Sequence, residues 1–267
     1  MNRRVGVLGC GWLGFPLAIS LVQDGYEAHG STTSEEKLAQ LKKEGIAPFI
    51  ISLRQKKING DVSGFLQDVG VLIVNVPPKL RGQNKENYVK KMQLLHTEVK
   101  KSSIQKIVFV SSTSVYGDVD GDVTEETIPQ PSSESGKQLL AAENIFRNDK
   151  DIDTTIVRFG GLIGPNRHPI TKLSGRQNLS NGNHPINLIH LNDCIRIIKS
   201  VLTNSWWNEV LNGVYPEHLS KQRYYSSEAK KKGLQVPDYK VNNTKKGKKV
   251  HSKVLINVKK FDFTTTL

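Results

Sequence analysis

The chain of 267 residues is poor in cysteine and has no long apolar run. Its two cysteines, Cys10 and Cys194, are too few for a disulfide framework, and Cys10 stands in a glycine-rich turn where a disulfide would hamper ligand approach. No segment approaches the roughly 18 apolar residues that a membrane span needs. The N-terminus leads directly into a strand pattern without a signal-peptide core. We therefore expect a cytoplasmic protein without a membrane partner.

Metal-ligand spacing is also missing, because histidine, cysteine and acidic residues nowhere form a cluster, and we predict no metal site. Acidic residues are scarce near the C-terminus, where residues 221–267 hold 13 lysines and arginines against three acids. The stretch Lys245-Lys246-Gly247-Lys248-Lys249 can attract nucleic acid or an anionic substrate. No aromatic interleaving or nucleic-acid motif accompanies it. We interpret it as a solvated lysine-rich surface and expect no nucleic-acid partner.

Apolar runs and helical patterns alternate along the first 160 residues. Predicted strands cover 3–8, 27–31, 48–51, 70–76, 106–111 and 154–158, and predicted helices cover 12–24, 34–44, 85–101 and 136–148. This order predicts an α/β fold, a Rossmann-type doubly wound parallel sheet with ligands at the carboxyl ends of its strands. The runs at 70–76 and 106–111 lack polar alternation, as strands buried on both faces do.

The pattern changes after Arg158, where residues 159–187 are rich in glycine, proline and asparagine. A helix capped near Asn192 follows. We predict an NAD(P)-binding domain of residues 1–158 and a smaller, substrate-side α+β region of residues 159–267 interleaved with it, because long loops over a rigid sheet tend to carry binding residues. The stretch 242–249 is predicted to be a mobile loop.

The loop Gly9-Cys10-Gly11-Trp12-Leu13-Gly14 follows the first predicted strand and opens an amphipathic helix. In such a loop the first glycine permits a tight turn, the second lets the backbone reach the pyrophosphate, and the third lets the helix pack closely. The helix N-terminus then faces the phosphates. We predict that Gly9, Cys10, Gly11, Trp12, Leu13 and Gly14 bind a nicotinamide dinucleotide.

The second strand lacks the acidic residue that would hydrogen-bond the free ribose 2′-hydroxyl of NAD. It runs instead into Ser31, Thr32 and Thr33, with Lys37 one helical turn further. Hydroxyl groups and a lysine can receive a 2′-phosphate, so we predict NADP in preference to NAD. A helix cap is the alternative role for Thr33 or Ser34, and the two roles are compatible.

Three later stretches resemble the extended short-chain dehydrogenase/reductases, the NAD-dependent epimerase/dehydratase family of sugar-nucleotide enzymes. They are Ser111-Ser112-Thr113-Ser114-Val115-Tyr116-Gly117, Val157-Arg158-Phe159-Gly160-Gly161-Leu162-Ile163-Gly164-Pro165 and Ile189-His190-Leu191-Asn192-Asp193. Together with the glycine loop they cover residue 5 to about residue 200 in the family's order. The resemblance implies that Ser112 helps to polarise the substrate.

The same resemblance implies a catalytic Tyr-x-x-x-Lys motif, in which the tyrosine is the acid/base and the lysine lowers its pKa. Gly136 and the Ala-Ala-Glu sequence that ends at Glu143 fit the family frame and put Ser135 in the tyrosine position and Leu139 in the lysine position. A second alignment keeps Lys137 as the lysine and sets Ser133 in the tyrosine position. Under either alignment the phenol is absent, so the chain resembles atypical members of the family.

Further residues are expected near the reacting groups. The nicotinamide should be bordered by Ser111 and by the residues after the fourth strand, Asn75-Val76-Pro77-Pro78. Ser112 should face the nicotinamide side from the fifth strand. Candidate acid/base groups are His190, Glu143 and His168. The alternatives are a hydrogen-bonded structural role for His190, a packing or capping role for Glu143, and no role for His168, which is expected in a loop. Candidate anion-binding groups are Arg158, Arg167 and Arg176, of which Arg158 is equally suited to a structural role.

Three functions follow from this pattern. The first is an NAD(P)-dependent oxidoreductase or epimerase-like enzyme for a small polar, anionic or nucleotide-sugar substrate, with a nonstandard proton source among Ser112, Ser135 and His190. The second is a noncatalytic NAD(P)-binding regulator or sensor. The third is a β-hydroxyacid or ketopantoate-type dehydrogenase, which predicts a largely helical C-terminal domain. A monomer or a homodimer, packed in the family through helices of the 85–101 and 136–148 kind, is expected.

Overall fold

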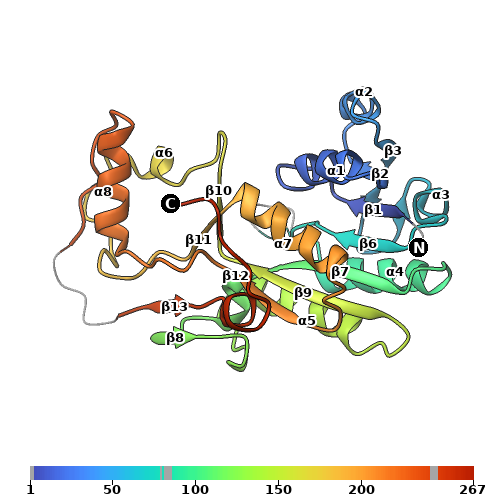
Figure 1. Cartoon of the computed structure of the whole chain (residues 1–267). Helices are drawn as coiled ribbons and strands as arrows, with labels where there is room; N and C mark the ends of the chain where they lie inside the picture. Colours follow the sequence, from blue (N-terminus) through green and yellow to red (C-terminus); the bar gives the residue numbers. More distant parts are fainter. Residues whose placement is uncertain (1–2, 79, 81–85, 241–245) are drawn as a thin grey trace.

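The computed structural model describes residues 3–78, 80, 86–240 and 246–267 and centres on a seven-stranded parallel sheet (Figure 1). Its strand order is β12-β9-β7-β6-β1-β2-β3. The strands are β1 (Arg4–Leu8), β2 (Glu27–Thr32), β3 (Ala47–Ile50), β6 (Val71–Val74), β7 (Lys106–Ser112), β9 (Asp153–Phe159) and β12 (Val210–Gly213). The chain winds outward from β1 in one direction and from β6 in the other, so the switch point lies between these neighbours. The predicted Rossmann-type α/β sheet is confirmed.

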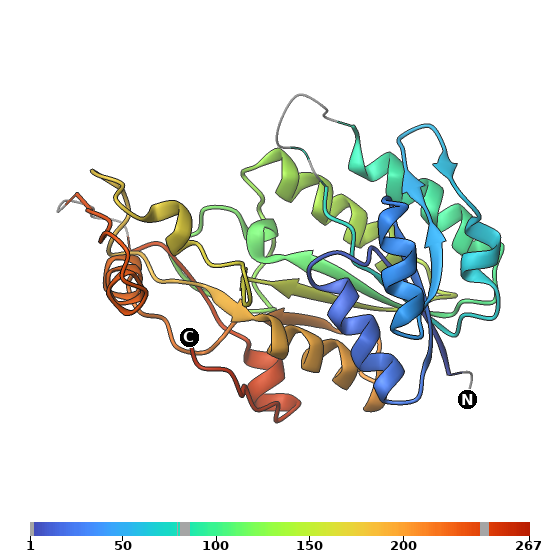
Figure 2. The same cartoon turned by 90° about the horizontal axis from the view of Figure 1, so that it is seen from above.

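Helices cover both faces of the sheet, as the view from above shows (Figure 2). One face carries α1 (Gly14–Gln23), α2 (Glu36–Lys43) and α7 (Leu191–Thr203), whose apolar side chains share one buried cluster. The other carries α3 (Val62–Leu66), α4 (Tyr88–Lys100) and α5 (Glu134–Arg147). In the described part of the chain, no helix is long and apolar enough to cross a membrane.

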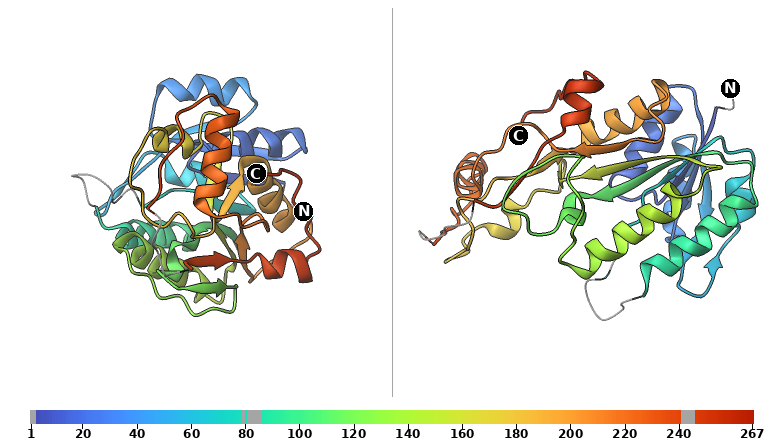
Figure 3. Two further views of the ribbon diagram at one scale, coloured as in Figure 1. Left: turned by 90° about the vertical axis from the view of Figure 1, so that its left-hand side faces the viewer. Right: turned by 90° about the horizontal axis from the view of Figure 1, so that it is seen from below.

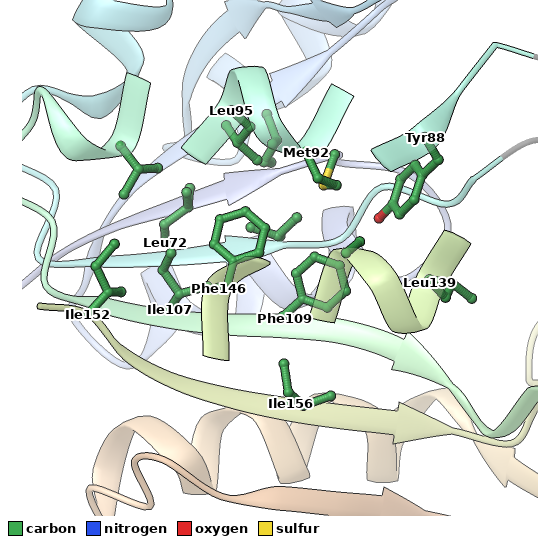
Figure 4. Close-up of a cluster of buried hydrophobic side chains, with 14 of the residues drawn as sticks. Leu72, Tyr88, Met92, Leu95, Ile107, Phe109, Leu139, Phe146, Ile152 and Ile156 are labelled. Carbon is green, nitrogen blue, oxygen red and sulfur yellow. The ribbon is translucent and has the colours of Figure 1, made fainter. Parts of the chain in front are cut away.

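The α4–α5 side of the core is rich in aromatic residues (Figure 4). Phe109 of β7 and Phe146 of α5 are both fully buried, with ring centroids 5.4 Å apart. Tyr88 and Met92 of α4 pack into the same cluster. Burying a side chain of this size stabilises the fold by about 2–3 kcal/mol, so these contacts fix α4 and α5 against the strands that carry the site.

Serine and asparagine caps set where these helices begin. Asn87 accepts a hydrogen bond from the Lys90 amide at the start of α4 (3.0 Å), and Ser133 accepts one from the Gly136 amide at the start of α5 (3.1 Å). Each cap satisfies an amide that the helix leaves unpaired. The helix α7, predicted to be capped near Asn192, has His190 as its N-cap, because a histidine ring nitrogen can accept the hydrogen bond of the Asn192 amide.

The region after Arg158 is built around a third cluster, beyond the carboxyl ends of the sheet strands (Figure 3). Its elements are β10 (Gly161–Ile163), α6 (Ile170–Leu173), β11 (Leu188–His190) and α8 (Lys221–Lys231). The strands β10 and β11 pair in parallel. The chain also returns to the main sheet, because β12 pairs with β9. No largely helical C-terminal domain forms among the described residues, which argues against the β-hydroxyacid dehydrogenase interpretation.

Short elements complete the fold: β4 (Ser52–Leu53), β5 (Ile58–Asn59), β8 (Gly121–Val123), β13 (Lys248–Val250), η1 (Thr113–Tyr116) and the single π-turn η2 (Val254–Val258). Strand β13 pairs with β8. The predicted mobile loop at 242–249 is therefore wrong at Lys248 and Lys249, which form a strand, and residues 242–245 lie outside the described residues. The division at residue 158 stays a prediction.

Candidate cofactor and substrate site

The glycine loop is held at the end of β1 by hydrogen bonds from two neighbouring strands. The amide of Gly9 donates to the hydroxyl of Ser31 (2.9 Å), and the amide of Cys10 donates to the Ser31 carbonyl (2.7 Å). From the other side, Asn75 Nδ2 donates to the Gly9 carbonyl (3.0 Å). Predicted residues from the ends of β1, β2 and β6 therefore meet in one place, and Ser31 and Asn75 fix the loop conformation.

Each glycine of the loop meets a different steric demand. Gly9 has a φ of 103°, and a Cβ there would lie 2.7 Å from the Asn75 carbonyl oxygen. A Cβ on Gly14 would collide with the Gly9 carbonyl oxygen and lie 2.8 Å from Asn75 Nδ2. At Gly11, by contrast, no atom lies within 4 Å of the place a Cβ would take. The open side of the loop is thus at Gly11, at the N-terminal end of α1, where a dinucleotide pyrophosphate fits.

A cleft of about 310 Å³ extends from this open side toward α2. It is lined by Cys10, Gly11, Trp12, Phe15, Pro16, Lys37, Gln40 and Leu41. The predicted 2′-phosphate residues divide into two groups: Ser31 and Thr32 are buried, whereas Thr33 and Lys37 are exposed. The Thr32 hydroxyl accepts from the Ser34 amide (3.2 Å). The N-cap of α2 is Glu35, so neither Thr33 nor Ser34 caps that helix.

Cys10 and Leu13 are the inward-facing residues of the loop. Both are buried in the core between the sheet and α1. The Cys10 thiol lies 3.7 Å from the Val7 carbonyl, and burial raises its pKa to about 12. A protonated, buried thiol is unreactive, so Cys10 offers a ligand its backbone alone.

Trp12 connects the glycine loop by side-chain contacts to the region after Arg158. Its indole N–H donates to the carbonyl of Pro165 (3.1 Å), and the guanidinium of Arg167 lies 4.8 Å from its ring centroid. Gly164 packs on the same ring, because a Cβ there would lie 3.1 Å from the indole. Of the predicted anion-binding arginines, Arg167 is thus the one that contacts the glycine loop, whereas Arg176 is exposed further along the chain.

The ends of β6 and β7 form the expected nicotinamide side. The Val76 carbonyl accepts a hydrogen bond from the buried Tyr88 hydroxyl (2.9 Å), and Pro77 is exposed beside it. Ser112 is half-buried at the end of β7, and its hydroxyl accepts from the Ser114 amide (3.2 Å) as η1 begins. Because β6 and β7 are adjacent parallel strands, Ser112 and the Val76-Pro77 turn share one edge of the sheet.

The first turn of α5 packs against η1. Gly136 makes this approach possible, since a Cβ there would lie 2.8 Å from the Ser114 carbonyl oxygen. Ser135, the residue in the tyrosine position, is half-buried beside it. Leu139, in the lysine position, is buried in the core, and Lys137 is exposed. In the alternative alignment the tyrosine position falls on Ser133, whose hydroxyl is the α5 cap.

Behind β7 lies a buried polar network. Glu143 forms an ion pair with Arg158 (2.6 Å) in which the two side chains are 0% and 2% exposed, and the Ser111 hydroxyl donates to the same carboxylate (2.6 Å). Arg158 also donates to the Tyr116 hydroxyl (3.0 Å), which donates to Asn212 Oδ1 (2.9 Å). These contacts support the structural alternative for Glu143 and Arg158, and the Ser111 hydroxyl is engaged by the Glu143 carboxylate.

The two candidate histidines have structural partners. His190 Nδ1 accepts from the Asn192 amide (3.2 Å) as the cap of α7. His168 Nε2 lies 3.0 Å from the Tyr224 hydroxyl, and its Nδ1 accepts from the Ile170 amide (3.2 Å). Burial lowers the pKa of both imidazoles. No hydrogen bond in the described ranges joins either ring to Ser112 or Ser135.

Sequence reasoning missed Tyr116, Asn212 and the Trp12 contact with Arg167. The available signal was Arg158 itself: a charged residue inside the apolar strand pattern of β9 requires buried partners. The direct partners of Arg158 are Glu143 and Tyr116, and Asn212 accepts in turn from the Tyr116 hydroxyl, so only the fold identifies this network.

Comparison with known proteins agrees with this geometry. The profile of NAD(P)H-binding proteins matches residues 10–186. Protein YeeZ of Escherichia coli K12 is 31% identical over 263 residues, which cover 98% of this chain and 96% of that protein. The uncharacterized UDP-glucose epimerase YtcB of Bacillus subtilis is 26% identical over 194 residues, 65% of this chain and 61% of that protein.

Solved structures share the fold. UDP-glucuronic acid 4-epimerase from Bacillus cereus in complex with NAD superposes with a TM-score of 0.79 at 21% identity, covering 98% of this chain and 92% of that chain. MoeE5 in complex with UDP-glucose and NAD gives a TM-score of 0.78 at 22% identity, covering 99% and 94%. With the matching profile, the full-length similarity to YeeZ and the glycine loop at the switch point, the chain belongs to the NAD(P)-binding epimerase/dehydratase family of short-chain dehydrogenase/reductases.

Proposed function

We propose that the protein is an NADP(H)-dependent oxidoreductase or epimerase-like enzyme for a small polar, anionic or nucleotide-sugar substrate. The observation that carries this proposal is the convergence of the open glycine loop, the Val76-Pro77 turn and Ser112 at adjacent strand ends. Residues 9–14 would hold the pyrophosphate, and residues 75–77 would border the nicotinamide. The cofactor, when bound, supplies or accepts the hydride.

The preference for NADP is supported by the charge at the end of β2. No acidic side chain lines the cleft beside Gly11, whereas the exposed Lys37 does. An ammonium group attracts a 2′-phosphate, and a missing carboxylate removes the partner of a free 2′-hydroxyl. Thr33, which is exposed directly after β2, offers an additional hydroxyl donor.

Calorimetric titration with NADPH and NADH tests the cofactor. We expect NADPH to bind at least tenfold more tightly, Gly11→Asp to abolish binding of both, and Lys37→Glu to weaken NADPH alone. Lys42→Glu, at the exposed far end of the same helix, is the matched control. If NADH bound ten times more tightly than NADPH, the NADP preference would be wrong. If neither bound, both nicotinamide functions would have to be abandoned.

For the substrate, Ser112 is the proposed hydrogen-bond donor to the reacting oxygen, and Ser135 and His190 are the candidates for the nonstandard proton source that the sequence pattern offers. The nucleotide-sugar class is supported by the UDP-glucose bound to MoeE5 and the UDP-glucuronic acid bound to the Bacillus cereus epimerase. The test is nicotinamide reduction or sugar epimerisation with UDP-glucose and UDP-glucuronic acid. Ser112→Ala should lower turnover by about 10²-fold, the size of a lost catalytic hydrogen bond, without weakening NADPH binding.

A noncatalytic NADP(H)-binding regulator is the second candidate. It is favoured by Ser135 and the buried Leu139 in the two motif positions, because neither exchanges a proton near neutral pH. This function predicts tight NADPH binding without turnover of any carbonyl or hydroxyl substrate. Turnover that is lost in Ser112→Ala would exclude it. Both free cysteines are buried, which supports a cytoplasmic site of action under either function.

A further inference from the structure

One side chain of the lysine-rich segment near the C-terminus, that of Lys248, contacts the turn η1 that follows Ser112. Strand β13 lies beside β8, the strand that follows η1. From β13, Lys248 Nζ donates to the carbonyls of Thr113 (2.9 Å) and Gly117 (2.8 Å), the residues at either end of η1. Thr113 directly follows Ser112. A residue interpreted from sequence as surface charge is therefore tied to the turn that begins at Ser112.

The backbone of Lys248 is fixed as firmly as its side chain. Asn187 Nδ2 donates to the Lys248 carbonyl (2.8 Å), and Asn187 Oδ1 accepts from the Val250 amide (2.8 Å). The Asn187 carbonyl also accepts from the Gly161 amide (2.7 Å). Three segments, β13, β10 and the residues before β11, are thereby locked together around this lysine.

The number of N–H donors on Lys248 Nζ decides whether this lysine can exchange a proton. An ammonium group has three N–H donors, and a neutral amine has two and a lone pair. Two carbonyl acceptors occupy two of the tetrahedral positions at Lys248 Nζ in the described structure. The remaining position carries an N–H in the charged form and a lone pair in the neutral form. A lysine held in this way has one position left at Nζ for exchanging a proton with a further partner.

We propose that Lys248 is the proton-exchanging group that this chain uses beside Ser112, in place of the Tyr-x-x-x-Lys pair. This inference rests on the proposed function. In the oxidative direction, the amine takes the proton of the substrate hydroxyl while that carbon gives its hydride to the oxidised nicotinamide dinucleotide, leaving a carbonyl. In the reductive direction, the ammonium returns the proton to the new alkoxide oxygen.

The surroundings suit this role. Half-burial lowers the pKa of Lys248, and the charge of Asp118 opposes that shift. Asp120, directly before the neighbouring strand β8, accepts from the Gly247 amide, and Asp122 within β8 forms an ion pair with His251 (2.6 Å), so both carboxylates already have partners. The imidazole of His184 packs against Gly247. A lysine less basic than usual transfers a proton more readily near neutral pH.

Three variants separate a chemical role from a structural one. Lys248→Arg keeps the charge and can donate to the same carbonyls but cannot give up a proton at neutral pH. Lys248→Met removes the charge and the hydrogen-bond donors. Lys249→Met, the next residue on β13, is the control. With UDP-glucuronic acid and NADP⁺, we expect turnover to fall at least 100-fold in both Lys248 variants and less than twofold in the control. Rescue by arginine would overturn the proposal.

A second readout does not need turnover. The lysine ε-methylene signals of isotopically labelled wild-type protein are titrated with pH, and the Lys248 signal is identified by its loss in Lys248→Arg. We expect its midpoint to lie below the ordinary value for a lysine, because burial lowers the pKa of Lys248, and to move when NADP⁺ and UDP-glucuronic acid are added. If NADPH binds but the signal does not respond to these ligands, the role of Lys248 is wrong. If NADPH does not bind at all, it is the proposed function that fails.

Discussion

The buried pair of Glu143 and Arg158 gives the sharpest stability prediction. Glu143→Ala removes the acceptor of three hydrogen bonds from Arg158 (2.6–3.2 Å) and of one from Ser111 (2.6 Å). The guanidinium would then remain buried with only the Tyr116 hydroxyl as partner. Breaking a buried ion pair on one side costs about 3–5 kcal/mol, because the other charge stays desolvated.

The size of the thermal effect follows from the chain length. An unfolding entropy of about 2.1 cal/mol/K per residue gives about 0.56 kcal/mol/K for 267 residues. A loss of about 3–5 kcal/mol therefore lowers the unfolding temperature by about 5–9 °C. The double variant Glu143→Met/Arg158→Met should be less destabilised than Glu143→Met or Arg158→Met alone, since replacing both charges by apolar groups is often neutral.

Urea unfolding of the cofactor-free protein, followed by tryptophan fluorescence, measures these differences. The single variant Arg158→Met should resemble Glu143→Ala, because it leaves the carboxylate buried with the Ser111 hydroxyl as its remaining partner. Single variants that lose less than about 1 kcal/mol, the usual net value of one ordinary hydrogen bond, would refute the reasoning. So would a double variant whose loss equals the sum of the two single losses, because independent sites add and coupled sites do not.

Three further predictions concern the loop and the histidines. Gly11→Ala should fold normally but weaken NADPH at least tenfold in calorimetry, whereas Gly14→Ala should also lower the unfolding temperature, because its Cβ meets the Gly9 carbonyl. An unchanged unfolding temperature for Gly14→Ala would contradict this. Cys10 should resist alkylation in the native protein at pH 8, since its pKa is about 12; rapid labelling would be the contrary result. Burial lowers the pKa of His168 below 6.5, so the unfolded state binds more protons and stability falls as pH drops below about 6.5. Unfolding measured against pH should be flatter there in His168→Gln, and an unchanged slope would exclude this source.

Much of the sheet was predictable because its strands are locally unambiguous. The runs Val71–Val74 and Ile107–Val110 are apolar without alternation, and the predicted boundaries differ from the observed ones by at most two residues. The helix α8 was missed because its stripe of buried residues consists of Tyr224, Tyr225, Glu228 and Ala229, which is not the aliphatic pattern that periodicity detects. Pairing of β8 with β13 has no local signature at all, since it joins residues more than a hundred positions apart.

The residues of the candidate site likewise include some that the sequence predicts and some that only the fold identifies. The glycine loop could be predicted because each glycine answers a local steric demand that the spacing alone encodes. The partners of Ser111 and the acceptors of Lys248 could not, because Glu143 and Thr113 are brought to them by packing between distant segments. For His190 the sequence offered both roles, and the capping bond at its Nδ1 supports the structural alternative.

Strand β12, which pairs with β9 at the edge of the main sheet, has a consequence for biosynthesis. When the first 158 residues have left the ribosome, β9 is still an open edge, because β12 lies some fifty residues further along the chain. An unpaired apolar edge invites association with other nascent chains. The hydroxyl of Tyr116 likewise has no Asn212 to receive its hydrogen bond until that strand arrives. Folding of the nucleotide-binding half is therefore completed late in translation, and a chain interrupted before residue 210 should be a client of chaperones rather than a smaller working domain.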